Sequence, residues 1–306
     1  MPAPIHRPYR GRVAPTPTGY LHRGHARAFA VAWARARHAG GTLLYRDEDL
    51  DAARCQPALA AAAMEDLRWL GLDWEEGPDV GGPHAPYRQS GRRAWFHEVW
   101  GQLQATGAIY PSPHSRKDVA EALAAPHGGE GEAIFPVALR PPPGAGADAT
   151  EAGEVNWRFR VPDGEAIAFV DACAGPQRFV AGEDFGDFLV WRRDGFPSYE
   201  LAVVADDHAM GVTEVVRGAD LLLSTARQLL LYRALGWAPP AWLHVPLVLG
   251  PDGRRLAKRA QSESLRALRE RGVDPAALRE TEIGAVLGPV ADNSVSQNRS
   301  RARPAT

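Results

Sequence analysis

The sequence predicts an α/β fold, with a doubly wound parallel sheet, a small mixed α/β insertion and a short helical C-terminal part. The chain begins with a strand, a loop, a helix and a second buried strand, which is the order of a parallel βαβ unit. Proline and glycine become dense between residues 107 and 195, and the apolar pattern of a parallel sheet returns after them. A chain of 306 residues is long enough for such a core and one smaller domain.

Residues 1–106 are expected to form the first half of a nucleotide-binding catalytic domain. A Pro/Thr/Gly loop at residues 15–19 separates the first strand from a helix that the glycines at 40–41 end. Pro57 opens a later helix, and Gly71 follows its end. The predicted elements are strands at residues 10–14 and 42–46 and helices at 24–38, 57–70 and 92–106.

The middle of the chain, residues 107–195, is expected to form an inserted subdomain. Short strands are predicted at residues 157–161, 166–171 and 177–180, and a Pro/Gly-rich mobile loop is predicted at 141–153.

Residues 196–250 are expected to complete the catalytic domain, with strands at 199–205, 212–217 and 244–249 and a helix between them. Ser224 is the predicted cap of that helix, and Gly236 is its predicted end. Residues 251–288 hold a basic loop and two short helices, for which Ser262 and Asp274 are the predicted N-caps. The polar residues 289–306 are expected to be disordered.

Composition limits the classes of function. The net charge of −2 gives no broad basic surface, so any contact with RNA has to be local. No run of 18 apolar residues predicts a membrane span, and residues 1–10 lack the apolar core of a signal peptide. Only Cys55 and Cys173 occur, which argues against a disulfide framework. We therefore expect a cytoplasmic protein.

His22 and His25 are three residues apart where a loop turns into a helix. This spacing places both imidazoles on the first helical turn, beside unpaired backbone N–H groups and the positive end of the helix dipole. Such a position suits phosphate, and imidazole donors there can stabilise the charge that grows as pyrophosphate leaves. Two surface histidines, or half of a metal site, are the alternatives.

A basic segment at residues 254–259, here called the lysine loop, follows a Pro-Asp-Gly turn. Of 35 basic residues only Lys117 and Lys258 are lysines, so Lys258 departs from the arginine preference of the chain. A compact ammonium group on a flexible stem is a point-charge ligand for phosphate. A solvated basic turn is the alternative.

One acid and two arginines form the third candidate group. Glu48 follows a strand and can hold an ammonium group, whereas Arg12 and Arg217 are placed at strand ends where each can hold a carboxylate. Together they match an α-amino dicarboxylic acid. A buried ion network that ties the strand ends together fits the same spacing.

Taken in order, these segments resemble the glutamyl branch of the class I aminoacyl-tRNA synthetases, which have Rossmann-like catalytic domains. The segments that carry the resemblance are residues 12–25 (RVAPTPTGYLHRGH), 46–51 (RDEDLD), 199–221 and 255–259 (RLAKR). The resemblance implies ATP-dependent activation of L-glutamate with Mg²⁺ and a tRNA as acceptor, with the insertion of the acceptor-binding type. It implies that glutamate is held by Arg12, Val13, Ala14, Pro15, Thr16, Glu48, Tyr199 and Arg217. It also implies that ATP is held by His22, Gly24, His25 and Lys258, with His22, His25 and Lys258 catalytic.

The length after the lysine loop suggests which members are most similar. Ordinary glutamyl-tRNA synthetases continue into a helical domain that reads the anticodon, whereas only residues 260–288 look foldable here. This resembles the truncated glutamyl-Q tRNA(Asp) synthetases, which attach glutamate to the queuosine base of tRNA(Asp). The expected partners are L-glutamate, ATP and tRNA(Asp) carrying queuosine, for a monomer. A truncated enzyme charging tRNA(Glu), or a non-catalytic synthetase-like protein that binds RNA or nucleotide, is the alternative.

Two departures from the family pattern are visible. Cysteines that often bind zinc in this family are replaced in the stretches 110–114 (YPSPH) and 134–138 (IFPVA), and His114 and His127 are too few for a four-ligand site. We therefore expect no structural zinc. Ala257 stands where the lysine loop usually has a serine, which predicts slower activation without loss of the positive charge.

Overall fold

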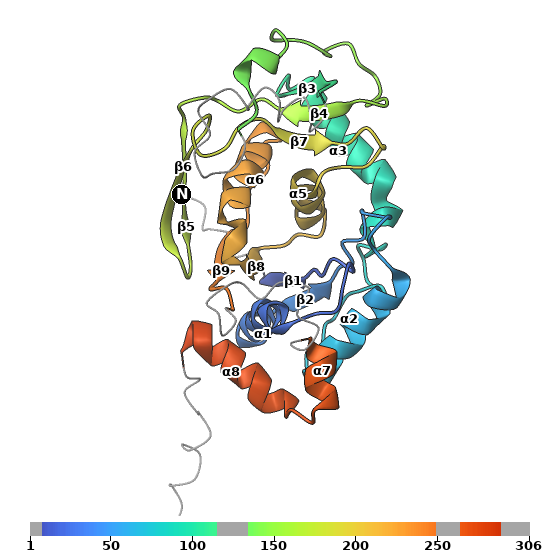
Figure 1. Cartoon of the computed structure of the whole chain (residues 1–306), viewed down its shortest axis with the longest axis vertical. Helices are drawn as coiled ribbons and strands as arrows, with labels where there is room; N and C mark the ends of the chain where they lie inside the picture. The colour runs from blue at the N-terminus through green and yellow to red at the C-terminus, as the bar shows by residue number, and fades with distance from the viewer. Residues whose placement is uncertain (1–7, 115–133, 249–263, 289–306) are drawn as a thin grey trace, which may run out of the picture.

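The computed structural model describes residues 8–114, 134–248 and 264–288 of the chain, and four short strands lie at its centre (Figure 1). Strand β1 (Arg10–Val13) pairs in parallel with β2 (Thr42–Tyr45), and β8 (Glu214–Gly218) pairs in parallel with β9 (Ala241–Val245). The inner strands β1 and β8 lie side by side, and the N–H of Thr213 donates to the carbonyl of Arg10. The two halves of the predicted catalytic domain, distant in sequence, therefore meet in one layer.

Side chains on these strands alternate between two hydrophobic cores. Leu43 and Tyr45 face one core, whereas Leu44 between them faces the other. Because both faces of the layer are buried, the predicted doubly wound α/β fold is confirmed. The helices that cover the faces are α1 (Arg23–His38) on one side and α5 (Tyr199–Ala209) and α6 (Leu222–Ala234) on the other.

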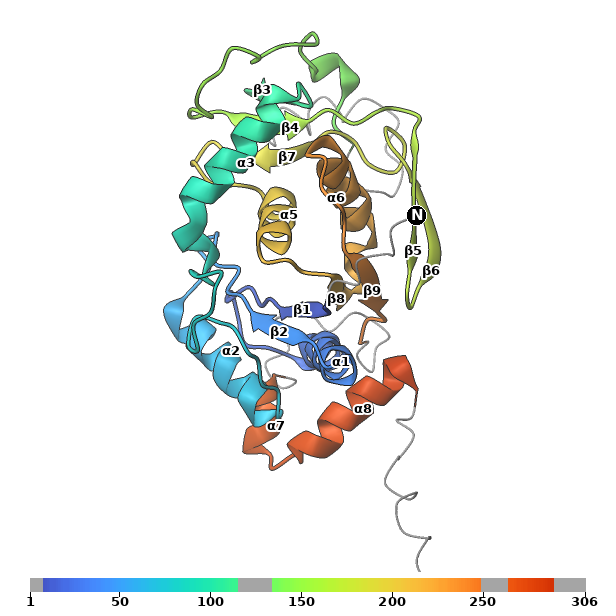
Figure 2. The same cartoon turned by 180° about the vertical axis from the view of Figure 1, so that it is seen from behind.

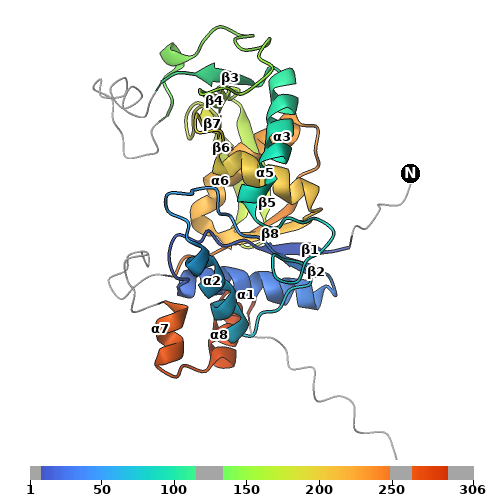
Figure 3. The ribbon, with the colours of Figure 1, turned by 90° about the vertical axis from the view of Figure 1, so that its right-hand side faces the viewer.

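The insertion forms a three-stranded antiparallel sheet at one end of the molecule and a hairpin that runs along its side, past α6 toward β9 (Figures 2 and 3). The sheet has the order β3 (Ile109–Ser112), β4 (Asn156–Phe159), β7 (Phe188–Trp191), and the hairpin consists of β5 (Ala166–Asp171) and β6 (Gly175–Val180). The three predicted strands agree with β4, β5 and β6 to within two residues, but β3 and β7 were not predicted. The hairpin reaches back to the central layer, where the N–H of Ala172 donates to the carbonyl of Trp242.

Four further helices complete the described part of the chain. They are α2 (Pro57–Trp69), α3 (Arg93–Ala105), α7 (Leu265–Glu270) and α8 (Pro275–Leu287), and short 3-10 turns lie at residues 89–92, 137–139 and 219–221. Asp274 caps α8 as predicted, because its carboxylate accepts from the N–H of Ala276. Gly71 follows α2 as predicted, with a φ of 80°. None of the described helices has the length and apolar character needed to cross a membrane.

The prediction of a strand at residues 199–205 is wrong, because this segment is helix α5. Residues 200–207 are all buried. Their burial therefore shows neither the alternation of buried and exposed residues that is typical of a strand nor the exposed stripe that is typical of a surface helix. The decisive signal is local: the hydroxyl of Ser198 accepts from the N–H of Leu201 and caps the helix.

Three boundaries also differ from prediction. Ser224 lies inside the first turn of α6, after the N-cap Leu221, and its hydroxyl donates to Glu200. Strand β9 ends at Val245, earlier than the predicted 244–249, because Pro246 follows it. The cap of α7 is Ser264, and Ser262 lies outside the described residues.

Asp187 organises the part of the insertion around Tyr110, in the stretch for which the absence of structural zinc is predicted. Its fully buried carboxylate accepts from Tyr110 Oη at 2.5 Å, from Arg140 Nε at 2.7 Å and from the N–H of Val161 at 2.9 Å. Among the residues that the structure describes, no three His, Cys, Asp or Glu side chains gather as a metal site. The absence of zinc from the whole chain stays a prediction.

The loop at 141–153 contains turns that are tied to α3 and to β4. The side-chain amide of Gln104 donates to the carbonyls of Gly146 and Ala147, and the indole of Trp157 donates to the carbonyl of Ala152. The mobility of this loop, like the domain boundaries, stays a prediction.

Glu282 joins the C-terminal helix α8 to α1. Its side chain is fully buried and accepts from Arg23 Nη2 at 2.6 Å and from Arg27 Nε at 2.8 Å. Arg23 lies between the two histidines of the predicted phosphate site. This ion cluster therefore holds the first turn of α1 against α8.

We predict that Glu282→Ala lowers the free energy of unfolding by about 2–3 kcal/mol, because both arginines lose a buried anionic acceptor. Urea denaturation measures the change. Glu280→Ala is the matched control, since Glu280 is an exposed residue of the same helix and its loss should cost less than about 0.5 kcal/mol. Equal losses in the two variants would contradict this role of Glu282.

Candidate active site

A cavity of about 400 Å³ opens at the carboxyl ends of β1, β8 and β9, beside the first turn of α1. Ten of the predicted site residues line it: Arg12, Ala14, Pro15, Thr16, His22, Gly24, His25, Glu48, Tyr199 and Arg217. Val13 does not, because its side chain points into the core beneath α1 and is fully buried. Lys258 lies outside the described residues.

The two histidines form the N-terminal cap of α1. His22 Nδ1 accepts from the N–H of Gly24 at 3.0 Å, and His25 Nδ1 accepts from the N–H of His22 at 3.2 Å. The ring centroids are 3.9 Å apart. Because each Nδ1 acts as an acceptor, each neutral ring carries its proton on Nε2. Both imidazoles are therefore Nε2–H donors at the wall of the cavity.

Gly24 is required by the position of His22. A Cβ atom on residue 24 would lie 2.9 Å from Cε1 of His22 and 3.1 Å from its Nδ1. A side chain would therefore push the imidazole out of its capping position. The glycine between the histidines keeps His22 close to the backbone of the helix start.

Both described ends of the segment that contains the lysine loop lie beside this site. Val248 lines the cavity at one end. At the other end Ser264 forms a bridge with His22, and the N–H of Leu265 donates to the carbonyl of Leu21 at 2.7 Å. Lys258 therefore belongs to a segment with one end bridged to His22 and the other end at the wall of the same cavity.

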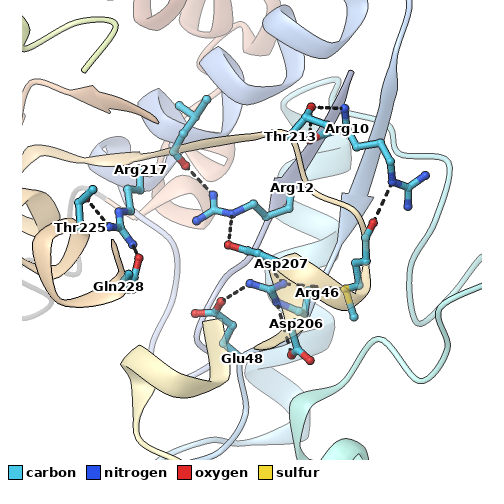
Figure 4. Close-up of polar contacts among 12 residues, drawn as sticks. Arg10, Arg12, Arg46, Glu48, Asp206, Asp207, Thr213, Arg217, Thr225 and Gln228 are labelled. Carbon is cyan, nitrogen blue, oxygen red and sulfur yellow. Dashed lines mark hydrogen bonds and ion pairs between the residues drawn. The ribbon is translucent and has the colours of Figure 1, made fainter. Parts of the chain in front are cut away.

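Arg12, Asp207, Arg46 and Glu48 form a buried ion network behind the cavity (Figure 4). Arg46 donates to Asp207 Oδ1 at 2.7 Å and to Glu48 Oε1 at 2.9 Å. Arg12 donates from Nη1 to the carbonyl of Val216 at 2.8 Å, and its Nε lies 3.7 Å from Asp207 Oδ2. Asp207 thus sits between two guanidinium groups that come from β1 and from the end of β2.

The charge state of Glu48 depends on this network. Burial raises the pKa of Glu48 above its ordinary value, although the neighbouring Arg46 and Arg12 oppose this shift. Its backbone N–H donates to the carbonyl of Pro15 at 3.0 Å, which fixes the residue beside the loop after β1. A cationic ligand group in the cavity would favour the ionised carboxylate further.

Arg217 is held by four partners behind the cavity wall. It donates to Thr225 Oγ1 at 2.7 Å, Gln228 Oε1 at 2.9 Å, His244 Nε2 at 3.0 Å and the carbonyl of Leu221 at 3.3 Å. Its Nη1 also lies 3.5 Å from Tyr199 Oη, at the cavity. The guanidinium is therefore fixed in one plane, with one edge toward Tyr199.

Sequence reasoning found ten of the twenty described residues that line the cavity but missed those that hold them. Asp206 and Asp207 belong to the helix predicted as a strand, and Thr225, Gln228 and His244 are separated from Arg217 by up to 27 residues. The alternative of an ion network tying strand ends is also correct in part, since Arg12 and Glu48 both belong to one. The site combines a carboxylate, two cationic groups and two Nε2–H donors around one space.

We predict that Asp207→Asn lowers the free energy of unfolding by about 3 kcal/mol or more, because Arg12 and Arg46 then share a buried site with one anion fewer. Urea denaturation is the measurement. Asp194→Asn is the control, since its pair with Arg192 is exposed and its loss should change stability by less than about 0.5 kcal/mol. A loss below about 1 kcal/mol for Asp207→Asn would show that the network is not a structural constraint.

Comparison with known proteins identifies the family. Residues 9–284 match the model of the class I tRNA synthetases (E and Q), catalytic domain. The chain is 52% identical to a glutamyl-Q tRNA(Asp) synthetase of Symbiobacterium thermophilum, over 90% of this chain and 84% of that protein. It is 43% identical to glutamate–tRNA ligase 2 of Acidithiobacillus ferrooxidans, over 88% of this chain and 56% of that protein.

A solved structure of the glutamate–tRNA synthetase of Elizabethkingia anophelis superposes with a TM-score of 0.77 at 29% identity. The match covers 90% of this chain and 61% of that one, so this chain spans less than two thirds of that synthetase. Residues 9–284, which the family model matches, contain both halves of the central layer and every described residue of the cavity. The chain belongs to the class I tRNA synthetases of the E and Q group, within their catalytic domain.

Proposed function

We propose that this chain activates L-glutamate with ATP to form glutamyl-adenylate and transfers the glutamyl group to the queuosine base of tRNA(Asp). The observation that carries the first step is the arrangement of Glu48, Arg12 and Arg217 around one cavity that also contains the histidine cap of α1. The acceptor is proposed from the 52% identity to a glutamyl-Q tRNA(Asp) synthetase, against 43% to a glutamate–tRNA ligase.

Glutamate would be oriented by charge at both ends. Glu48 would hold the ammonium group, and Arg12 and Arg217 would hold the side-chain carboxylate. Ala14, Pro15 and Thr16, from the loop after β1, would contribute the wall of the pocket beside them. Val13 would act indirectly, because its side chain is buried in the core that supports β1.

ATP would lie against the first turn of α1. The α-carboxylate of glutamate attacks the α-phosphorus of ATP, so that a new O–P bond forms, and the bond between the α-phosphorus and the oxygen that links it to the β-phosphorus breaks, releasing pyrophosphate. The Nε2–H groups of His22 and His25 would donate to phosphate oxygens as negative charge moves to the leaving group, and Lys258 would add a positive charge. Mg²⁺ bound to the phosphates would neutralise part of their charge.

The enzyme supplies position and charge in this mechanism and forms no covalent intermediate. In the second step a nucleophile on the queuosine base attacks the carbonyl carbon of the adenylate, and AMP leaves. L-Glutamate, ATP and tRNA(Asp) carrying queuosine are therefore the proposed substrates, and a monomer is the proposed form.

A second candidate is the charging of tRNA(Glu) at its 3′ end. It is favoured by the 43% identity to the Acidithiobacillus ligase and by the fold shared with the Elizabethkingia synthetase. The cavity fits both candidates, because the activation of glutamate is common to them. The acceptor assay separates them.

We expect pyrophosphate exchange that depends on glutamate and not on aspartate or glutamine, and that proceeds without tRNA. Glutamate should then be transferred to tRNA(Asp) that carries queuosine and not to tRNA(Asp) without it, as measured with radiolabelled glutamate. Exchange with aspartate alone, or none with any amino acid, would refute the activation step. Transfer to tRNA(Glu) alone would establish the second candidate.

Lys258→Ala should reduce the rate of glutamate-dependent pyrophosphate exchange at least about tenfold, because a positive charge on the departing phosphates is lost. Lys117→Ala is the matched control, since Lys117 is the only other lysine and is proposed to have no role in activation. A Lys258→Ala enzyme with the wild-type rate would remove Lys258 from the mechanism. A wild-type chain without activity would favour the non-catalytic, synthetase-like alternative.

A further inference from the structure

A chain of three buried side chains connects the insertion to the arginine proposed to bind glutamate. Asp171 Oδ2 lies 2.6 Å from His244 Nδ1, and His244 Nε2 lies 3.0 Å from Arg217 Nε. The three residues belong to β5, β9 and β8, and Asp171 and His244 have fully buried side chains. Of these three residues, only Arg217 lines the cavity.

The direction of each hydrogen bond follows from Arg217. A guanidinium is always protonated, so its Nε–H donates and His244 Nε2 has to accept. His244 is therefore neutral with its proton on Nδ1, and that proton is donated to Asp171. Burial, together with the charge of Arg217, lowers the pKa of His244 to about 4 against the opposing effect of Asp171.

Asp171 is itself fixed by the backbone. Its Oδ1 accepts from the N–H groups of Cys173 at 2.9 Å and Ala174 at 2.7 Å, in the turn that connects β5 to β6. The backbone N–H of His244 also donates to this carboxylate, at 3.0 Å from Oδ2. Oδ2 is therefore held toward the imidazole, and only the carboxylate can supply acceptors on both sides.

Arg217 has five N–H donors, and four of them are satisfied inside the protein by His244, Gln228, Thr225 and Leu221. The fifth, on Nη1, faces Tyr199 Oη at 3.5 Å, which is longer than an ordinary hydrogen bond. Tyr199 lines the cavity. The N–H group of Arg217 that faces Tyr199 is therefore the one that can turn to a ligand in the cavity.

We propose that Asp171 and His244 are positioning residues that hold the guanidinium of Arg217 at the angle required to bind the side-chain carboxylate of glutamate. The inference rests on the proposed function and deepens it, because Asp171, a residue of the inserted hairpin, would then contribute to the selection of glutamate by Arg217. Neither residue touches the substrate. Their effect is on the binding of glutamate and not on ATP.

Asp171→Asn tests this role because the position of the amide is dictated by its neighbours. The backbone N–H groups of Cys173 and Ala174 require the oxygen at Oδ1, so the NH₂ group faces His244 Nδ1. His244 then has to carry its proton on Nε2, opposite the Nε–H of Arg217, and the two donors repel. The KM for glutamate should rise about tenfold or more, whereas kcat and the KM for ATP should stay within about twofold of wild type.

Two variants of His244 form a matched pair. In His244→Gln the side-chain oxygen can reach the place of Nε2 and accept from Arg217, whereas His244→Asn can reach only Asp171. The KM for glutamate should therefore be lower in His244→Gln than in His244→Asn, although both replace a buried imidazole by an amide. A purely structural role would give the same KM in both.

Asp184→Asn controls for loosening of the hairpin, since Asp184 is an exposed residue that accepts from the N–H of Val180 and does not contact His244. Its KM for glutamate should equal that of wild type. Nitrogen-15 NMR of labelled histidine should place the His244 proton on Nδ1 in wild type and on Nε2 in Asp171→Asn.

An Asp171→Asn enzyme with an unchanged KM for glutamate, beside an active wild type, would overturn the positioning role alone. A parallel rise of the KM for ATP would overturn it as well. A wild-type chain that shows no exchange with glutamate would overturn the proposed function, and the positioning role would fall with it.

Discussion

The structure depends on one pair of buried carboxylates, Asp206 and Asp207 on α5. Both side chains are fully buried, and between them they contact Arg12, Arg46 and Arg92. Burial would lower the pKa of Arg46, but Asp207 and other carboxylates raise it above its ordinary value. Removing such charges from water costs several kcal/mol per ion unless partners compensate. The pair therefore fixes α5 against the central layer, and with it Arg12, which lines the cavity.

This constraint also explains why the charged side chains around the cavity, which are of opposite sign, do not pair with one another across it. Glu48 is held by Arg46, whose other contact is Asp207, so each charge in the series already has a partner before any ligand enters. Arg217 is held separately, by neutral acceptors and by His244. The two arginines proposed to bind one carboxylate are thus fixed by different means: Arg12 by an ion pair from α5, and Arg217 by a network that includes the insertion. Pre-organised charge of this kind reduces the reorganisation that binding requires.

Half of the described residues at the cavity wall could be predicted, because they belong to strand ends, to the loop after a strand or to the start of a helix, which local sequence patterns indicate. His22, Gly24 and Glu48 are examples. Val13 was misplaced because alternation along β1 turns its side chain into the core. The supporting groups could not be predicted, since α5 is buried on all sides and its sequence has no period, and since His244 meets Arg217 only through the pairing of β8 with β9. Contacts of that kind arise from tertiary structure.

The most direct test of this account is a crystal structure of the chain with a non-hydrolysable analogue of glutamyl-adenylate. The account predicts the side-chain carboxylate of the analogue within about 3 Å of the guanidinium groups of Arg12 and Arg217, and its ammonium group beside Glu48. The linker that replaces the phosphate should lie against His22 and His25. An analogue bound in the reverse direction, with its carboxylate at the histidines and both arginines unengaged, would contradict it.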